Sequence, residues 1–405
     1  MHRSLRFIPA LLLGVLGGCQ DRSVSPAAGR AGRSFATTAS AASCPANPTA
    51  VVTDEATLRA ALAAARPGDV IAVSGTIELT TGDTIATDGV TLTCATPGSG
   101  LVAAPIDSTG FQVTDLVTVT ARGVVLDNLV LDGSNASDSP LFAVNDGETA
   151  FAQDVRFTHN NVTCARFGSC VFIAGGTGAV VSDNSFEATD AFTGIHLQAN
   201  GPDLTVPVFP IRIDGARIER NTIVALTPSL SSRFGAIRPF DADHLTIADN
   251  VISGPWRNGV SPARLANTQI QGNQIEGAVV DGIRTSSFGG AFPGLVARNV
   301  FTSNRVTGAG RAGIFATRAC SNQFASNDLR GNAGDLGLLL TDTTGANVVA
   351  GVANAVVVDD GAFDCDADSR TDPNIITGGV THHQPAPPDT TSAAPARRPH
   401  DPQPL

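Results

Sequence analysis

The residues best suited to chemistry are a histidine and two arginines that occupy the same point of a repeated pattern. His196, Arg238 and Arg284 each directly follow an isoleucine, in the segments GIH, AIR and GIR. A cation that neutralises a uronic-acid carboxylate makes the C5 proton acidic, and a base can then remove that proton. We therefore predict a subsite for a carboxylated sugar. The alternative is that all three are solvated residues on a polar face.

Two more residues lie close to this pattern. Ser261 stands at the corresponding point after Gly259-Val260, and Trp256, the only tryptophan, precedes it in the turn 254–258. An indole can stack on a sugar ring. We assign both residues to binding, with packing of Trp256 against its own loop as the alternative.

The elements that must position these side chains belong to a repeat. From residue 128 onward the pattern of asparagine, any residue and an apolar residue recurs, at intervals of 32, 24, 37, 29, 23, 31 and 23 residues. A base period of 23 or 24 with additions is typical of a solenoid with loop insertions. The asparagines are Asn128, Asn160, Asn184, Asn221, Asn250, Asn273, Asn304 and Asn327.

A second marker, a small residue followed by an aliphatic one, keeps step with most of these asparagines. It occurs at Gly194-Ile195, Ala236-Ile237, Gly259-Val260, Gly282-Ile283, Gly313-Ile314 and Gly337-Leu338. The pieces between are short and β-branched, so each coil must stack on the next to bury its apolar face. This predicts an all-β, single right-handed parallel β-helix over residues 44–380, with an inward asparagine ladder. Alternation along the strands places His196, Arg238, Ser261, Arg284, Phe315 and Leu339 outward on one face.

The N-terminal end of the solenoid needs a cover. Residues 54–66 predict an amphipathic helix with Leu58, Leu62 and Ala65 on one face, ending before Pro67-Gly68. The phrase TLRAALAAARPGDVIAVSGTIEL resembles the start of the pectate-lyase-like superfamily of right-handed β-helix proteins. With the two repeated markers, the resemblance covers roughly residues 50–380.

The resemblance is specific for fold and unspecific for activity. Lyases and epimerases of the superfamily place their functional residues in a groove along the helix. The resemblance thus implies His196 as a base and Arg238 and Arg284 as carboxylate clamps. The chain contains no lysine, which excludes lyases with a lysine base, and it lacks the paired-aspartate motifs of β-helix polygalacturonases.

The N-terminus has the features of an export signal. Arg3 and Arg6 precede an apolar run that is too short to span a bilayer as a helix. Leu16-Gly17-Gly18-Cys19 resembles the lipobox of bacterial lipoproteins, which implies a signal peptide over 1–18, lipidation of Cys19 and export to the cell envelope. An ordinary signal peptide with a chance cysteine is the alternative. Residues 19–43 are too polar and small to form a core, so we expect a flexible tether.

Six cysteines remain in the exported part, an even number that favours disulfides. Six cysteines allow 15 connectivities and spacing does not choose among them. We predict pairing in sequence order, which joins Cys44 to Cys94, Cys164 to Cys170 and Cys320 to Cys365. No zinc-type cysteine or histidine spacing is present, and we expect no metal and no cofactor.

Charge limits the partners. The formal net charge is −11, and removal of Arg3 and Arg6 (−11 − 2) brings it to −13. This balance gives no support for nucleic acid, or for membrane contact other than through the lipid anchor. Residues 381–405 are proline-rich and predict a disordered tail.

Two functions remain open from the sequence. One is an envelope-anchored monomer that binds acidic, uronate-containing polysaccharide and cleaves or epimerises it. The other is a non-catalytic surface adhesin or envelope scaffold.

The lipobox-like segment gives the first testable prediction. Mass spectrometry of the mature protein should show a chain that begins at Cys19 and carries acyl groups. An unmodified Cys19, or cleavage at another site, would remove the anchor from the hypothesis.

Overall fold

The computed structural model describes residues 43–106, 110–200, 211–227, 235–285, 296–333, 336–341, 344–358, 365, 374–377 and 382–383. The expected signal peptide, Cys19, nearly all of the expected tether and most of the expected tail lie outside these residues. The β-helix belongs to the unit Thr38–Leu405.

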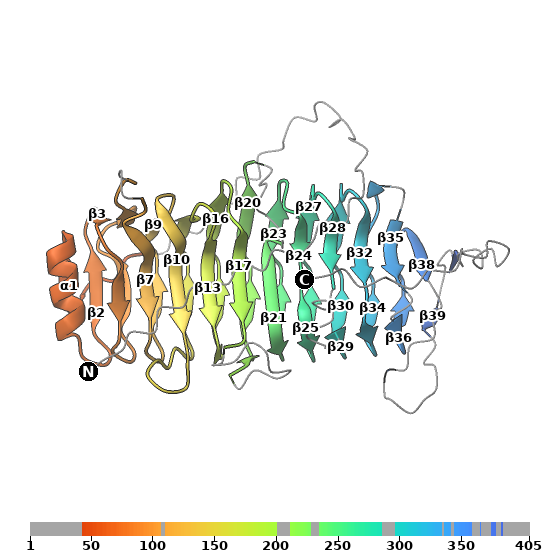
Figure 1. Cartoon of the computed structure of the whole chain (residues 1–405), viewed down its shortest axis with the longest axis horizontal. Coiled ribbons are helices and arrows are strands. Elements are labelled where there is room, and N and C mark those ends of the chain that lie inside the picture. The colour runs from red at the N-terminus through yellow and green to blue at the C-terminus, as the bar shows by residue number, and fades with distance from the viewer. Residues whose placement is uncertain are drawn as a thin grey trace, which may run out of the picture. The chain divides into compact units, whose positions relative to one another are not determined.

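The first coil is covered by α1 (Glu55–Ala64), the only helix among the described residues (Figure 1). Asp54 caps it, with its side chain accepting from the Thr57 N–H at 2.8 Å and the Thr57 hydroxyl contacting the backbone of Asp54 in return. Leu58 is fully buried in the core, and Leu62 packs against it. The helix predicted at 54–66 is confirmed, and at 10 residues it is too short to cross a membrane.

Three groups of parallel strands, here called sheets A, B and C, form the walls of the solenoid. Sheet A has the order β1 (Ala50–Val52), β2 (Val70–Val73), β5 (Thr91–Cys94), β8 (Val125–Asp127), β11 (Arg156–Thr158), β15 (Val180–Ser182), β19 (Arg217–Glu219), β22 (Thr246–Ala248), β26 (Gln269–Gln271), β30 (Val300–Thr302), β34 (Gln323–Ala325), β37 (Val348–Ala350) and β39 (Ile375–Thr377). Sheet B has the order β3 (Thr76–Leu79), β6 (Gly100–Ala103), β9 (Val130–Asp132), β12 (Asn161–Thr163), β16 (Ser185–Ala188), β20 (Thr222–Ala225), β23 (Val251–Ser253), β27 (Gln274–Glu276) and β31 (Arg305–Thr307).

Sheet C carries the longer strands, some of them broken into two pieces. It contains β4 (Asp83–Ile85), β7 (Val113–Val119), β10 (Ala136–Val144), β13 (Ser169–Ala174), β14 (Gly176–Thr177), β17 (Thr193–Gln198), β18 (Ile213–Asp214), β21 (Ile237–Asp243), β24 (Asn258–Val260), β25 (Ala263–Ala266), β28 (Asp281–Arg284), β29 (Val296–Ala297), β32 (Ala312–Ala316), β33 (Ala319–Cys320), β35 (Leu336–Leu340), β36 (Thr344–Gly345), β38 (Ala355–Val358) and β40 (His382–His383).

Each strand pairs in parallel with its counterpart one coil away, so a right-handed β-helix results, as the repeat predicts. Side chains at the same point of successive coils therefore become neighbours, about 4.8 Å apart. The second sequence marker shows this directly, because its aliphatic residues pair in one column and are fully buried. They are Ile195, Ile237, Val260, Ile283, Ile314 and Leu338.

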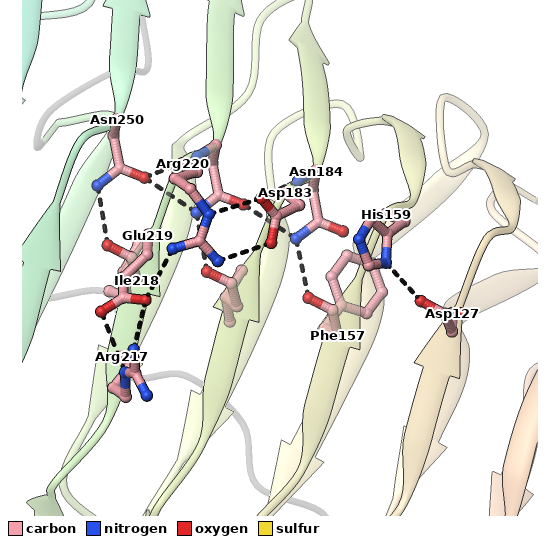
Figure 2. Close-up of polar contacts among 12 residues, drawn as sticks. Asp127, Phe157, His159, Asp183, Asn184, Arg217, Ile218, Glu219, Arg220 and Asn250 are labelled. Carbon is pink, nitrogen blue, oxygen red and sulfur yellow. Dashed lines mark hydrogen bonds and ion pairs between the residues drawn. The ribbon is translucent and has the colours of Figure 1, made fainter. Parts of the chain in front are cut away.

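The predicted asparagine ladder runs along the turn between sheets A and B, from Asn160 to Asn327. Figure 2 shows the part of it that contains Asn184 and Asn250. Asn250 shows the repeating geometry. Its Oδ1 accepts from the backbone N–H and the side-chain amide of Asn221, at 3.0 and 2.9 Å. Its own amide donates to the Ile218 carbonyl and to Asn273, both at 2.9 Å. Every polar atom of the side chain is thus satisfied in a dry environment.

Asn128, the first asparagine of the predicted ladder, is not part of it. Its coil places Leu129 at the ladder position, and the Leu129 N–H donates to Asn160. Asn128 sits one residue earlier, with φ +56°, where its coil neighbour His159 has φ +54°. Asparagine tolerates this left-handed conformation better than most residues, so it suits this turn position as well as the ladder position. The predicted pattern was wrong by one residue in this coil.

A second ladder, which the sequence pattern did not reveal, joins sheet C to sheet A. The Thr268 N–H donates to Asn299, whose N–H donates to Asn322, and the chain of bonds continues through Asn347 to Asn374. Two turns of the late coils are therefore fixed by stacked amides.

The disulfides join the cysteines in sequence order, as predicted. The Cα separations are 5.3 Å for Cys44–Cys94, 4.2 Å for Cys164–Cys170 and 5.7 Å for Cys320–Cys365. At the other end of the chain, β40 pairs with β38, so strand pairing extends to residue 383, slightly beyond the boundary predicted at 380.

The ladder makes a stability prediction. Asn250→Ala should lower the free energy of unfolding by about 1–3 kcal/mol for each buried group that loses its partner, chiefly on Asn221 and at the Ile218 carbonyl. Denaturant unfolding measures this. Asn128→Gly is the matched control, because it lies outside the ladder and glycine suits its positive φ, and it should change stability by less than about 0.5 kcal/mol. Equal losses in both variants would contradict the role of the ladder.

Candidate functional site

Strand pairing brings the predicted site residues onto one column of sheet C. His196 on β17 pairs directly with Arg238 on β21. Ser261 takes the next coil and Arg284 on β28 the one after, because the residues that precede them pair in register. The predicted order His196, Arg238, Ser261, Arg284 and Phe315 along this column is confirmed.

The N-terminal half of the column is buried, contrary to the expected exposed site. His196 is 8% exposed and Arg238 is 7% exposed. The imidazole stacks on Phe172, with ring centroids 4.6 Å apart and planes inclined by 7°. Phe142 follows Phe172 at 5.2 Å on the preceding coil. Phe142, Phe172 and His196 thus form a stack of rings on the outer side of sheet C, and this stack covers the N-terminal half of the column.

His196 and Arg238 bond to each other. Arg238 Nη1 lies 3.1 Å from His196 Nε2. Burial and the neighbouring guanidinium hold the pKa of His196 well below its usual value, so the ring is neutral and Nε2 accepts from Arg238. Burial lowers the pKa of Arg238 to about 10, which leaves it charged at neutral pH. The lone pair that a general base would use is therefore engaged by a cation.

Arg284, in the C-terminal half of the column, is partly exposed, and a cluster of arginines lies there around one carboxylate. Asp281 is fully buried and accepts from Arg311, with Nε at 2.8 Å from Oδ1 and Nη2 close to Oδ2. Arg284 Nη1 lies 3.7 Å from the same carboxylate. Both guanidiniums face the ring of Phe315, at 5.3 Å for Arg284 and 3.9 Å for Arg311.

Positive charge exceeds negative charge in this cluster. The side chains of Arg284 and Arg311 are 29% and 35% exposed, and Arg257 on the preceding coil is exposed. Burial lowers the pKa of Arg284. The carboxylate of Asp281 raises that pKa, and the positive charges of Arg311 and Arg257 lower it further. Two guanidiniums, those of Arg284 and Arg311, thus share one carboxylate, and Arg257 adds a third positive charge that acts on Arg284. This group, here called the arginine cluster (Arg257, Arg284, Arg311, with Asp281 and Phe315), favours an incoming anion.

Two other arginines of sheet C have protein carboxylates close by. Arg212 Nε lies 3.4 Å from Asp241, and its Nη1 lies 3.4 Å from Asp243. Arg264 Nη2 lies 3.6 Å from Asp241. This group of charges is balanced, two against two, unlike the arginine cluster.

Trp256 does not reach the surface. It is 2% exposed and belongs to the hydrophobic core, so the expectation that it stacks on a sugar is wrong. The turn of residues 254–258 directs the ring inward because a large apolar side chain gains more from burial there than from exposure. Ser261 is 8% exposed and separates the two cationic coils of Arg238 and Arg284.

Sequence reasoning missed Asp281 and Arg311. Asp281 occurs two residues before Ile283, and Arg311 three before Ile314, in the same repeat that gave the column. An inspection of the residues on both sides of each aliphatic marker would have found them.

The same inspection would also have found a buried polar column that includes Asp115, whose Oδ1 accepts from the Ser139 hydroxyl at 2.6 Å. Burial, helped by the nearby charge of Asp138, raises the pKa of Asp115 to about 7.

No group of three histidine, cysteine or acidic side chains in the described parts of the chain is arranged to hold a metal ion.

Comparisons with known proteins agree with this architecture. The family model of right-handed β-helix regions matches residues 211–359. The Dettilon tailspike protein superposes with a TM-score of 0.53 at 15% identity, over 76% of this chain and 62% of its own, so this chain spans less than two thirds of it. DFA-IIIase from Arthrobacter chlorophenolicus A6 in complex with GF2 gives 0.53 at 14% identity, over 80% and 93%.

A search of curated proteins gave no match. Identities this low establish the fold alone. The fold defines a right-handed parallel β-helix protein.

The buried His196 predicts a pH effect on stability. In the unfolded chain its pKa returns to about 6.5, so below that pH the unfolded state binds a proton that the folded state refuses. Stability should therefore fall as the pH decreases below about 6.5. His196→Gln keeps an acceptor for Arg238 without titrating, and should reduce this slope by up to about 1.4 kcal/mol per pH unit.

Urea unfolding of both proteins at about pH 7 and about pH 5 measures the slope. Identical slopes would mean that His196 titrates normally in the folded protein, which its position between Phe172 and Arg238 does not allow.

Proposed function

We propose that this protein is a lipid-anchored envelope protein that binds acidic polysaccharide on sheet C without transforming it. The observation that carries the proposal is the arginine cluster, where two partly exposed guanidiniums share one buried carboxylate and the exposed Arg257 stands on the preceding coil, in a chain whose net charge is −11. Such a local excess of one sign, against the sign of the whole molecule, favours a specific anionic ligand over general attraction.

A carboxylated sugar matches the chemistry of the cluster. The forked N–H groups of arginine suit a carboxylate, and Asp281 and Phe315 hold the two guanidiniums in place. The solenoid wall continues in both directions, which suits a polymer better than a small molecule. The net negative charge disfavours nucleic acid, whose phosphates are densely spaced.

Binding is supported better than turnover. The base that the superfamily resemblance implies is His196, and its Nε2 already accepts from Arg238. The low pKa of the buried His196 imidazole also makes it a weak proton acceptor. We therefore favour the adhesin or scaffold role over a lyase or epimerase. Lipidation at Cys19 and a short tether would hold the β-helix at the envelope.

The arginines provide the test. Arg284→Ala and Arg311→Ala should each weaken binding of oligogalacturonate by roughly 10- to 100-fold, the loss expected for about 1.5–3 kcal/mol of charge-assisted hydrogen bonding. Isothermal calorimetry on the purified chain from Cys19 onward measures the affinity. Arg298→Ala is the matched control, because Arg298 is exposed at another turn, where it donates to Asn267.

Neutral oligosaccharides should not bind, and no unsaturated product should accumulate in ultraviolet absorbance. Failure of the parent protein to bind any acidic polysaccharide would overturn the proposal. Unsaturated product would overturn its non-catalytic part.

A further inference from the structure

A disulfide-closed loop on sheet C presents an aromatic ring to solvent. Cys164 and Cys170 close the loop, and Phe167 at its tip is 55% exposed. Its φ of +69° lies in the left-handed region, which bulky residues seldom adopt. Backbone strain of this kind persists where the surroundings enforce it and is concentrated at functional positions.

The surroundings of the loop do enforce it. The Phe167 N–H donates to the Asp190 carbonyl at 3.1 Å, and the Phe192 N–H donates to the Gly168 carbonyl at 2.6 Å. A Cβ on Gly168 would lie 1.8 Å from the Asp138 carbonyl oxygen, so only glycine fits there. The backbone of the loop is thus fixed to the coils on both sides, which lowers the entropic cost of presenting the ring to a ligand.

The guanidinium of Arg166 lies over the ring of Phe167. The Arg166 guanidinium carbon lies 5.2 Å from the centre of the ring, and the Arg166 side chain is 54% exposed. Asp190 lies 3.9 Å from Arg166. The arrangement of an accessible arginine over a phenylalanine ring repeats that of Arg284 and Arg311 over Phe315.

Strand register places both arrangements on the same edge of sheet C. Ser169 pairs with Thr193, and the same column continues through Asn258 and Asp281 to Ala312. Gly168 comes directly before Ser169, just as Arg257 comes before Asn258 and Arg311 before Ala312. Three to five coil steps separate the loop from the arginine cluster, or about 14–24 Å at the usual spacing of strands.

We propose that Phe167, with Arg166, is a second contact for the same polysaccharide, which lies along this edge of sheet C from the loop to the arginine cluster. The inference rests on the proposed function and specifies the ligand as an extended acidic chain that spans several coils. A ring with an adjacent guanidinium offers an apolar face to the C–H groups of a sugar and a cation to its acid group. Two such contacts on a rigid wall give an affinity that depends on chain length.

The test compares two sizes of oligogalacturonate by calorimetry. One oligomer is shorter than about 14 Å, and the other is longer than about 24 Å. Phe167→Leu keeps apolar volume and removes the ring, and it should weaken the long oligomer roughly tenfold while leaving the short one unchanged. Phe167→Trp restores a ring and should restore the affinity for the long oligomer.

The matched control is Phe151→Leu. The Arg122 guanidinium carbon lies 5.5 Å from the Phe151 ring, at the turn that leads from sheet C to sheet A rather than at the edge with the loop. This variant should bind both oligomers like the parent protein.

The outcomes separate this inference from the proposed function. If the parent binds neither oligomer, the proposed function fails and the inference fails with it. If the parent binds both but Phe167→Leu binds the long oligomer equally well, or loses both equally, the second contact is overturned while the arginine site stands.

Discussion

The stacking of one coil on the next in strict register is the constraint on which the rest of this structure depends, and the asparagine ladders enforce it. A ladder asparagine bonds to the backbone and side chain of the asparagine on the neighbouring coil, and its amide donates to a backbone carbonyl of sheet A. A shift of one residue would bury these amides without partners, at a cost of about 1–3 kcal/mol for each. An apolar core alone tolerates such shifts far better, since it has no directional bonds to lose.

Fixed register converts sequence position into spatial position. Residues at one point of successive coils lie about 4.8 Å apart, close enough for like charges to repel strongly in a partly dry environment. The column of sheet C avoids this repulsion. A neutral imidazole precedes Arg238, Ser261 separates Arg238 from Arg284, and a phenylalanine follows Arg284. Positive charge can thus accumulate along the wall without two guanidiniums occupying adjacent positions of the column.

Much of this could be predicted from the sequence, because the features concerned are periodic. The two markers predicted the fold and the column from His196 to Phe315, whereas the pairing of the cysteines in sequence order was predicted independently of them. Burial of His196 and Arg238 could not be predicted in the same way. Alternation says which side of a strand a residue faces, and not what covers it from outside. The prediction that Trp256 is exposed was wrong for a related reason, since a turn residue has no alternation that fixes the direction of its side chain.

Single-residue offsets and long side-chain reach explain the other differences. Asn128 matched the pattern by type, but a left-handed turn position and a ladder position both favour asparagine, so type alone could not separate them. Arg311 was missed because it approaches Phe315 and Asp281 from the start of its strand, outside the column that alternation defines. Side chains as long as arginine link positions that backbone register keeps apart.

The net charge of the whole chain is negative, whereas the local charge of the arginine cluster is positive, and this contrast determines how such a site would act. Beyond a Debye length, about 8–10 Å at physiological salt, a polyanion meets a molecule whose net charge of −11 repels it weakly and is largely screened. Only at contact do the guanidiniums of the arginine cluster dominate, because there they are partly desolvated and oriented by Asp281 and Phe315. Recognition of the proposed polyanion would therefore depend on a close geometric match between ligand and arginines rather than on electrostatic steering. A rigid solenoid, whose register fixes each arginine, is well suited to provide that match.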